Sequence, residues 1–347
     1  MQQLTTGEGH FVDQNHHINT FTFKMEILKR KDSYLFKHAY KHGIFDEEVD
    51  GPLHWALQNG CIEAALYMIK EGEDTNRLDS IRRSPLKVAL VKNYLDVFKA
   101  LVENKADVNF VGANNQSLLF RAIEEGKLQY AEVLINSGAN VKLGITTSNN
   151  FTPLHAAAWY GATHIAKLLI MNGAEINAKT TNHQKTPLFL ASHKGHQEIV
   201  EILINMRANQ TPLLAAEINA KTIALESPLH AASCKGHQEI VKILLENGAE
   251  HNIKDTQKNE PIHYASDKGH IQCLETLIQN GAYFDAEGED GMTSLQMAIY
   301  ENHTAIAQML LNCGANSNVK DNLGISPMEQ AITKKALKSF KLLAFFN

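Results

Sequence analysis

The sequence predicts an all-α solenoid of stacked helix-turn-helix units that are connected by β-hairpin loops. Three observations support this fold class. A hexapeptide typified by TPLHAA recurs nine times, a residue suited to a left-handed turn usually follows at a fixed distance, and an apolar stretch at helical spacing follows the turn. Such a period is typical of repeat architectures, in which stacked neighbours complete a core that one unit cannot bury alone.

The hexapeptide keeps its phase along most of the chain. It reads GPLHWA, SPLKVA, SLLFRA, TPLHAA, TPLFLA, SPLHAA, EPIHYA, TSLQMA and SPMEQA. Its second position falls at Pro52, Pro85, Leu118, Pro153, Pro187, Pro228, Pro261, Ser294 and Pro327, at intervals of 33, 33, 35, 34, 41, 33, 33 and 33 residues. Eight residues further on, most units carry Gly or Asn, which adopt a left-handed conformation at low cost.

One unit shows how each element is specified. Ser227 can cap a helix, and Pro228 fits the first turn because no amide donor is needed there. Gly236 ends this helix, and HQEIVKILLENG then predicts a second helix that ends at Gly248. The second helix has an apolar face formed by Ile240, Val241, Ile243, Leu244 and Leu245. The following AEHNIKDTQKNE is expected to form an extended hairpin to the next unit.

This pattern resembles the ankyrin family, whose repeat of about 33 residues carries T-P-L-H-x-A. The segments TPLHAAAWYGATHIAKLLIMNGAEINAKT and SPLHAASCKGHQEIVKILLENGAEHN match the family pattern almost throughout. The resemblance implies an ankyrin-repeat domain of nine repeats over residues 49–347. Residues 1–48 are expected to form an N-terminal flexible segment and a capping helix, which YLFKHAYKHG (Tyr34 to Gly43) would supply.

Two places depart from the regular repeat. The 41-residue interval contains an insertion at 209–216 (NQTPLLAA), which is interpreted as an enlarged hairpin loop or as a loop that reaches a partner. The ninth repeat carries lysines at 334, 335, 338 and 341. We interpret that repeat as a C-terminal cap with a polar outer face, because a solenoid needs such an end.

Composition restricts the class of partner and the compartment. The net charge of -5 provides no basic field for nucleic acid or an anionic membrane. No apolar run approaches the roughly 20 residues of a membrane span, and the N-terminus lacks a secretory signal. Four separated cysteines without a CxxC pair fit a reducing compartment. We therefore expect a soluble, cytoplasmic monomer that binds neither nucleic acid nor membrane.

The residues do not predict catalysis. No HExxH, GxSxG or phosphate-loop motif is present, and the carboxylates of Glu287, Glu289 and Asp290 are expected to form a solvated hairpin tip. The repeat accounts for the paired sets of histidines, which are expected to serve structure. These are His54, His155, His230 and His263 in the hexapeptide and His196, His237, His270 and His303 after the turn. We expect no catalytic residue, no metal and no cofactor.

The resemblance implies that a partner binds along a concave face formed by the first helices and the hairpin tips. It places the fifth hexapeptide position and the last turn of the first helix on that face. The residues expected to contact a partner are Trp55, Arg121, Trp159, Tyr160, His193, Lys194, Lys235, Tyr264, Lys268 and Tyr300. Aromatic and basic side chains together suit an acidic or extended protein segment.

The hairpins suggest one modification. The contexts of Asn109 and Asn177 resemble the sequence that the asparaginyl hydroxylase of ankyrin proteins modifies. Both are also ordinary hairpin residues of the fold, so this hypothesis depends on a host that has the enzyme.

Four functions are compatible with these features. The first is a protein–protein interaction scaffold or adaptor that presents a rigid groove. The second is an ankyrin-repeat effector of an intracellular bacterium, which would act on proteins of the host cytosol. A substrate adaptor of a ubiquitin ligase would need a box motif, and residues 1–48 contain no match. An enzyme would need its active site within those same residues, which are too few to bury one.

Overall fold

The computed structural model describes residues 24, 26, 33–44, 50–112, 115–143, 149–205 and 217–346. The chain divides into two compact units, residues 1–140 and 141–347, and each is described by itself. Most of the predicted N-terminal segment and the predicted insertion at 209–216 lie outside the described residues.

Both units consist of antiparallel helix pairs. Unit 1 contains α2 (Ser33–Lys41), α3 (Pro52–Asn59), α4 (Ile62–Lys70), α5 (Pro85–Lys92), α6 (Leu95–Glu103), α7 (Leu118–Glu124) and α8 (Leu128–Asn136). Unit 2 begins with α9 (Pro153–Tyr160), α10 (Thr163–Met171), α11 (Pro187–Lys194), α12 (Gln197–Asn205), α13 (Pro228–Lys235) and α14 (Gln238–Glu246). It continues with α15 (Pro261–Asp267), α16 (Ile271–Gln279), η3 (Glu289–Gly291), α17 (Ser294–Tyr300), α18 (Thr304–Asn312), α19 (Pro327–Thr333) and α20 (Leu337–Phe346).

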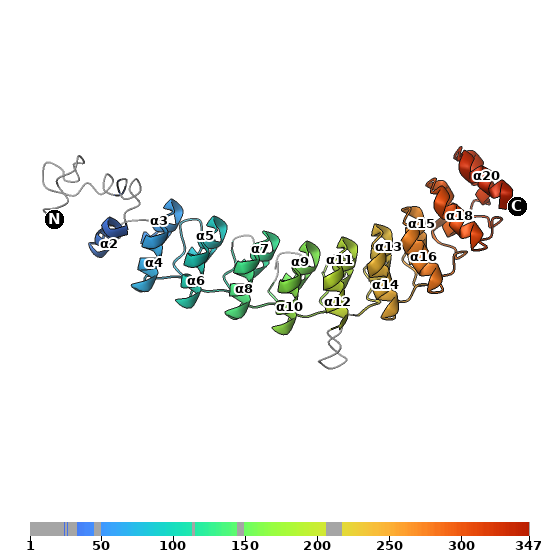
Figure 1. The fold of residues 1–347 in the computed structure, drawn as a ribbon. Helices are drawn as coiled ribbons and strands as arrows, with labels where there is room; N and C mark the ends of the chain where they lie inside the picture. The colour runs from blue at the N-terminus through green and yellow to red at the C-terminus, as the bar shows by residue number, and fades with distance from the viewer. Residues whose placement is uncertain are drawn as a thin grey trace. The chain divides into compact units, whose positions relative to one another are not determined.

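The helices of each unit form two layers. Within a unit, the odd-numbered first helices from α3 onward pack side by side, and the even-numbered second helices pack in the same order (Figure 1). This arrangement confirms the predicted all-α solenoid. None of the helices in the described ranges is long and apolar enough to cross a membrane.

Local sequence sets the ends of the first helices. The Ser227 hydroxyl accepts a hydrogen bond from the amide of His230, and Pro228 follows in the first turn. At the other end, all nine predicted turn residues have a positive φ, including Lys335 at 55°. The left-handed turn is therefore confirmed in every repeat, even where the side chain does not favour it.

The core lies between the two layers. In the sixth repeat it receives Leu229 and Ala232 from α13 and Ile240, Val241 and Leu244 from α14, all of which are buried. Small residues line the contact between neighbouring first helices, as three consecutive buried alanines of α9 show. Because each repeat buries its apolar face on the next one, stability is a sum of nearest-neighbour terms.

The hairpins contain no strand in the part of the chain that the structure describes. There they are turns closed by backbone hydrogen bonds, such as Asp255 N to Asn259 O at 3.0 Å, with one isolated bridge between Val111 and Ser117. Successive tips are also bonded to each other, because the amide of Thr256 donates to the Ala224 carbonyl at 3.0 Å. The predicted hairpin loops therefore exist as turns rather than as strand ladders.

The two ends of the described array differ. Phe36 of α2 is buried and stacks on Trp55, with ring centroids 5.9 Å apart. At the other end α20 buries Leu343 but leaves Phe345 and Leu337 84% and 63% exposed. The outer face of the last repeat is therefore mixed, and not only polar as the lysines suggested.

Candidate functional site

Two sets of histidines fix the first helices of unit 2. His155 and His230 donate from Nε2 to the carbonyls of Lys185 and Asn259, at 3.0 and 3.1 Å. Burial lowers the pKa of both imidazoles to about 4, so they are neutral at physiological pH. His54 of unit 1 makes the equivalent bond to the Arg83 carbonyl, and His263 donates instead to the carbonyl of the hairpin residue Ala286 at 2.9 Å. The structural role that the sequence predicts for these four residues is confirmed.

The histidines after the turns bond backward along the array. His237 Nε2 contacts the His193 carbonyl at 3.3 Å, and His196, His270 and His303 make the equivalent contact at 2.9–3.1 Å. Each imidazole lies over the glycine that ends the preceding first helix, and a Cβ on Gly195 would be 2.6 Å from His237. Across the described ranges, no three His, Cys, Asp or Glu residues are grouped so that they could hold a metal ion.

With the helices held in this way, their last turns expose a row of side chains. Tyr160 and Tyr300 are 47% and 46% exposed, and Lys194, Lys235 and Lys268 are also exposed. These residues come from α9, α17, α11, α13 and α15, which pack in sequence. Unit 2 therefore presents a continuous face that carries most of the residues expected to contact a partner.

Aromatic rings and basic groups meet on this face around His193. Its ring stacks on Trp159, with centroids 6.0 Å apart and planes at 10°, and on Phe189 at 6.4 Å. Lys194 Nζ lies 3.8 Å from the Trp159 ring centroid, and Lys185 Nζ lies 5.4 Å from that of Phe189. We call these five residues, together with Lys235, the His193 cluster.

The electrostatics of the His193 cluster favour an anion. Desolvation lowers the pKa of His193 to about 4, and the nearby charges of Lys235, Lys185 and Lys194 and of His237 act in the same direction. The imidazole is therefore neutral, and its buried Nδ1 has no hydrogen-bond partner among the described residues. The cluster thus concentrates positive charge and leaves one ring nitrogen unsatisfied.

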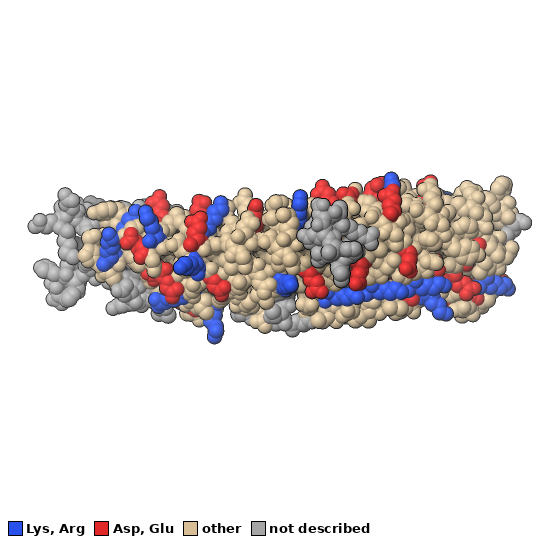
Figure 2. Space-filling view, turned by 90° about the horizontal axis from the view of Figure 1, so that it is seen from below, with Lys and Arg blue, Asp and Glu red and all other residues tan. Residues whose placement is uncertain are grey.

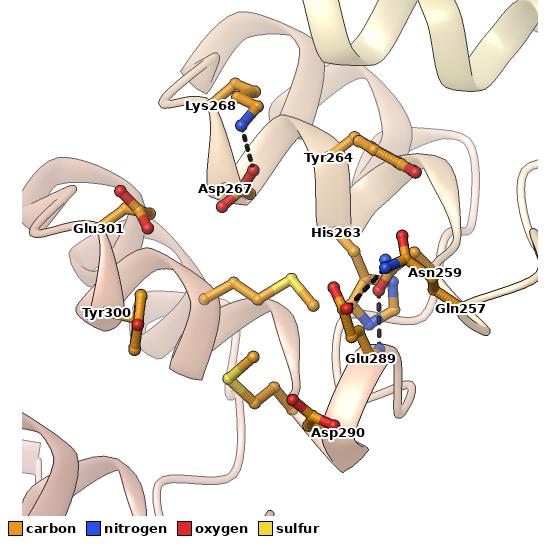
Figure 3. Close-up of a pocket in the computed structure, with 12 residues that line it drawn as sticks. Gln257, Asn259, His263, Tyr264, Asp267, Lys268, Glu289, Asp290, Tyr300 and Glu301 are labelled. Carbon is orange, nitrogen blue, oxygen red and sulfur yellow. Dashed lines mark hydrogen bonds and ion pairs between the residues drawn. The ribbon is translucent and has the colours of Figure 1, made fainter.

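A pocket of about 420 Å³ opens between α15 and α17 (Figure 3). Tyr264 stands on the α15 side, Tyr300 and Met297 belong to α17, and the hairpin between the two helices supplies Met292. The Tyr264 hydroxyl donates to Asp255 Oδ2 at 2.6 Å, and burial and this carboxylate raise its pKa. The tyrosine is therefore a fixed neutral wall. We call this cavity the α15–α17 pocket.

The rim of the α15–α17 pocket is acidic. Asp267 pairs with Lys268 at 2.8 Å, and Glu289 accepts a hydrogen bond from Gln257 at 2.6 Å. Asp290 and Glu301 also line the cavity, and neither forms an ion pair with any residue that the structure describes. Glu287 and Asp290 are exposed and Glu289 is half-buried, which agrees with the expected solvated tip, and Glu289 and Asp290 also belong to this rim.

The hairpins carry a second charged feature that the sequence reasoning missed. Figure 2 shows basic side chains in a line along one edge of the C-terminal part, among mixed charges elsewhere on that face. Exposed lysines occupy the same hairpin position in four repeats, at Lys179, Lys221, Lys254 and Lys320. The sequence does contain a signal for this row of lysines. In the segments NAKT, NAKT, NIKD and NVKD, a lysine stands two residues after the hairpin Asn.

Two expected partner residues, Trp55 and Arg121, belong to unit 1. Trp55 stacks on Phe36, and Arg121 forms an ion pair with Glu125 at 2.6 Å. The fifth hexapeptide position, expected to face the groove, is half-buried in these two residues and in Tyr264. It is buried in the other repeats, at Val88, Ala156, Leu190, Ala231, Met297 and Gln330. At this position, therefore, only Trp55, Arg121 and Tyr264 are exposed enough to contact a partner.

The two asparagines considered for hydroxylation make the same bond between repeats. The Oδ1 of Asn109 accepts from the Asn140 amide at 2.7 Å, and that of Asn177 accepts from the Glu217 amide at 2.8 Å. Both side chains therefore join neighbouring hairpins. Hydroxylation of either residue stays a prediction.

Paired helices with left-handed turns and interlocked histidines define a helical repeat protein. The family description "Ankyrin repeats (3 copies)" matches residues 25–112, 86–180, 178–255, 212–288, 229–321 and 262–346. The chain belongs to the ankyrin-repeat family. Repeats of this family are generally non-enzymatic modules for protein–protein interaction.

Several known proteins are similar to the chain. Human transient receptor potential cation channel subfamily A member 1 is 26% identical over 199 residues, which cover 54% of this chain and 17% of the channel. The probable 26S proteasome regulatory subunit p28 of Saccharomyces cerevisiae is 28% identical over 191 residues, 54% of this chain and 80% of p28. Palmitoyltransferase AKR1 of Lachancea kluyveri is 29% identical over 135 residues, 38% of this chain and 18% of the transferase. The chain thus spans less than a fifth of the channel and of the transferase.

Proposed function

We propose that this chain is a protein-interaction scaffold that binds an extended acidic segment of a partner protein. The segment would lie along the face of unit 2 that the last turns of the first helices form. The His193 cluster is the observation that carries the proposal. It combines three stacked rings with three lysines, while Lys194 and Lys235 are exposed at the ends of neighbouring helices.

The chemistry of the cluster supports this partner class. The half-buried rings of Trp159 and His193 supply rigid apolar area at little cost in conformational entropy, as interface anchors do, and the buried Phe189 supports His193 from below. Lys194 and Lys235 have no ion pair within the described residues, so a carboxylate of the partner could bind them without breaking an internal ion pair, although Lys194 also contacts the Trp159 ring.

The compartment belongs to the same proposal. All four cysteines are free, although Cys61 and Cys234 are only half-buried and Cys313 is exposed. Free accessible thiols suit a reducing environment such as a cytosol. We therefore place the binding event there.

Charge reversal tests the proposal. The double variant Lys194→Glu and Lys235→Glu changes two exposed residues of the face, and Lys167→Glu with Lys242→Glu makes the same charge change on the second helices α10 and α14. The probe is a fluorescein-labelled peptide with a run of about six glutamates, measured by fluorescence polarisation. We expect the face variant to weaken binding about tenfold or more and the control by less than about twofold.

The outcome is decided by the comparison of the two variants. Equal losses in both would mean that the peptide follows the net charge of the protein, and the proposal would be wrong. Added salt should weaken binding to the wild type, because exposed charges are screened within about 10 Å at 0.1 M.

A further inference from the structure

We propose that the α15–α17 pocket binds one lysine or arginine side chain of the same partner polypeptide whose acidic segment docks on the His193 cluster. The inference rests on the proposed function and adds the chemistry and the register of a second anchor. The sequence of the partner would then contain an acidic run and, at a fixed separation before or after it, one basic residue.

The walls of the pocket suit a long basic side chain. Met292, Met297 and the two tyrosines provide apolar surface below a charged rim, within a cavity of about 420 Å³. Lysine and arginine bury their aliphatic stems on such surface while the charged head stays at a polar edge. Figure 3 shows the carboxylates of Asp267, Glu289, Asp290 and Glu301 around the cavity, which Met292 and Met297 also line.

The charge of the rim selects a cation. Four carboxylates and one ammonium group line the pocket, and a second ammonium group, that of Lys334, lies over the ring of the lining residue Tyr300, so two negative charges remain there. His263 does not change this balance, because burial lowers its pKa and both its ring nitrogens are hydrogen-bonded. An uncharged or acidic side chain would leave the carboxylates of Glu289 and Asp290 without a counterion, so it would bind less well.

Ammonium groups of the chain itself already use two edges of the pocket. Lys334 Nζ, from the end of α19, lies 3.3 Å from the centroid of the Tyr300 ring, and Lys268 pairs with Asp267. The aromatic wall and one carboxylate thus already hold cations. Lys268 also interacts electrostatically with Glu301, whereas Glu289 and Asp290 form no ion pair with a cation among the described residues. A basic side chain of the partner would supply the counterion that these carboxylates lack.

The separation of the two anchors follows from helix packing. From α11, which carries His193 and Lys194, the pocket lies two helix steps further at α15 and extends toward α17. Neighbouring helix axes are about 8–10 Å apart, so the anchors are roughly 16–25 Å apart. An extended chain advances about 3.3 Å per residue, which places the basic residue roughly five to eight residues from the acidic run.

Selection from a random library tests this register on the full chain. A phage library of peptides about 16 residues long can hold both anchors at that separation. It is selected on the wild type, on the double variant Asp290→Asn and Glu301→Gln, and on the control Glu246→Gln and Glu250→Gln. Both variants remove two negative charges, but Glu246 and Glu250 do not line the pocket. Asn tolerates the left-handed φ of 55° at position 290.

The proposal expects a basic residue at a fixed separation from an acidic run on the wild type and on the control, and only the acidic run on the pocket variant. For one enriched peptide, replacing the basic residue by norleucine should lower the affinity for the wild type about tenfold and that for the pocket variant by less than about twofold. A basic residue that is absent, or equally enriched on the pocket variant, overturns the inference. If no acidic run is enriched on the wild type, or if the run persists on the Lys194→Glu and Lys235→Glu variant, the proposed function fails instead.

Discussion

The hydrogen bonds of His230 give a prediction that distinguishes the contribution of hydrogen bonding to stability from that of side-chain packing. This fully buried imidazole accepts at Nδ1 from the Ser227 amide at 3.1 Å and donates from Nε2 to the Asn259 carbonyl at 3.1 Å. Another repeat of the chain has a glutamine at the position that His230 occupies. In the eighth repeat Gln296 accepts from the Thr293 amide and donates to the Ile325 carbonyl, both at 3.0 Å. We therefore compare His230→Leu with His230→Gln.

The structure sets the expected size of each effect. In the leucine variant the buried Ser227 amide loses its acceptor, which costs about 1–3 kcal/mol, and the net value of the second bond adds about 1 kcal/mol. The Asn259 carbonyl keeps a second donor, the Asp255 amide at 3.0 Å, so it is not left unsatisfied. We expect His230→Leu to cost about 2–4 kcal/mol, and His230→Gln to cost less than about 1 kcal/mol because both bonds can be remade.

Urea unfolding followed by circular dichroism measures the stability of the whole array. Hydrogen exchange of the amides in α13 measures the local effect, which should be a roughly 30- to 900-fold acceleration in the leucine variant. The imidazole also makes an edge contact with Tyr264, with centroids 5.7 Å apart at 84°. If the glutamine variant lost as much stability as the leucine variant, this ring contact would be the main contribution and the hydrogen-bond argument would be wrong.

Two further predictions concern glycine and pH. Gly236→Ala and Gly248→Ala both place a side chain at positive φ, at a cost of about 1–2 kcal/mol. The first should cost roughly 1–2 kcal/mol more in a urea titration, because its Cβ would be 2.6 Å from the ring of His270 while the second meets nothing within 4 Å; equal costs would contradict the interlock. The lowered pKa of His155 and His230, about 4 against an ordinary 6.5, means that the unfolded chain binds more protons between these values. Stability present above pH 6.5 is therefore lost as the pH falls toward 4, by about 2 kcal/mol per histidine between pH 7 and 5. Urea titrations at both pH values should show a smaller loss in His230→Gln, and an unchanged loss would show that this imidazole is protonated in the folded state.

The sequence was sufficient to predict the fold because the repeat determines every local element. Pro at the first turn, Gly or Asn at the helix end and an apolar second helix recur in phase, and the structure places a left-handed residue at each predicted turn. Lys335 shows the limit of this reasoning. It adopts φ 55° although its side chain does not favour it, because its place in the repeat overrides its own preference.

The candidate site could be predicted only in part. Exposure at the end of the first helices follows from the repeat phase, so Tyr160, Lys194 and Tyr300 could be found. The α15–α17 pocket could not, because it joins residues of α15, α17 and the hairpin between them, and its volume depends on side-chain packing. Nor does phase alone predict that Leu190 is buried where Tyr264 is half-buried, since that depends on side-chain size.

The glycine–histidine contacts also bear on how the length of such an array can change. Gly161, Gly195, Gly236 and Gly269 each receive the histidine of the following repeat. If residues 237–269 were excised, Gly195 would meet His270 and Gly236 would meet His303, so every remaining joint would again pair a glycine with a histidine. The central joints are thus interchangeable, and recombination in phase could lengthen or shorten this region by whole repeats without creating a new kind of contact.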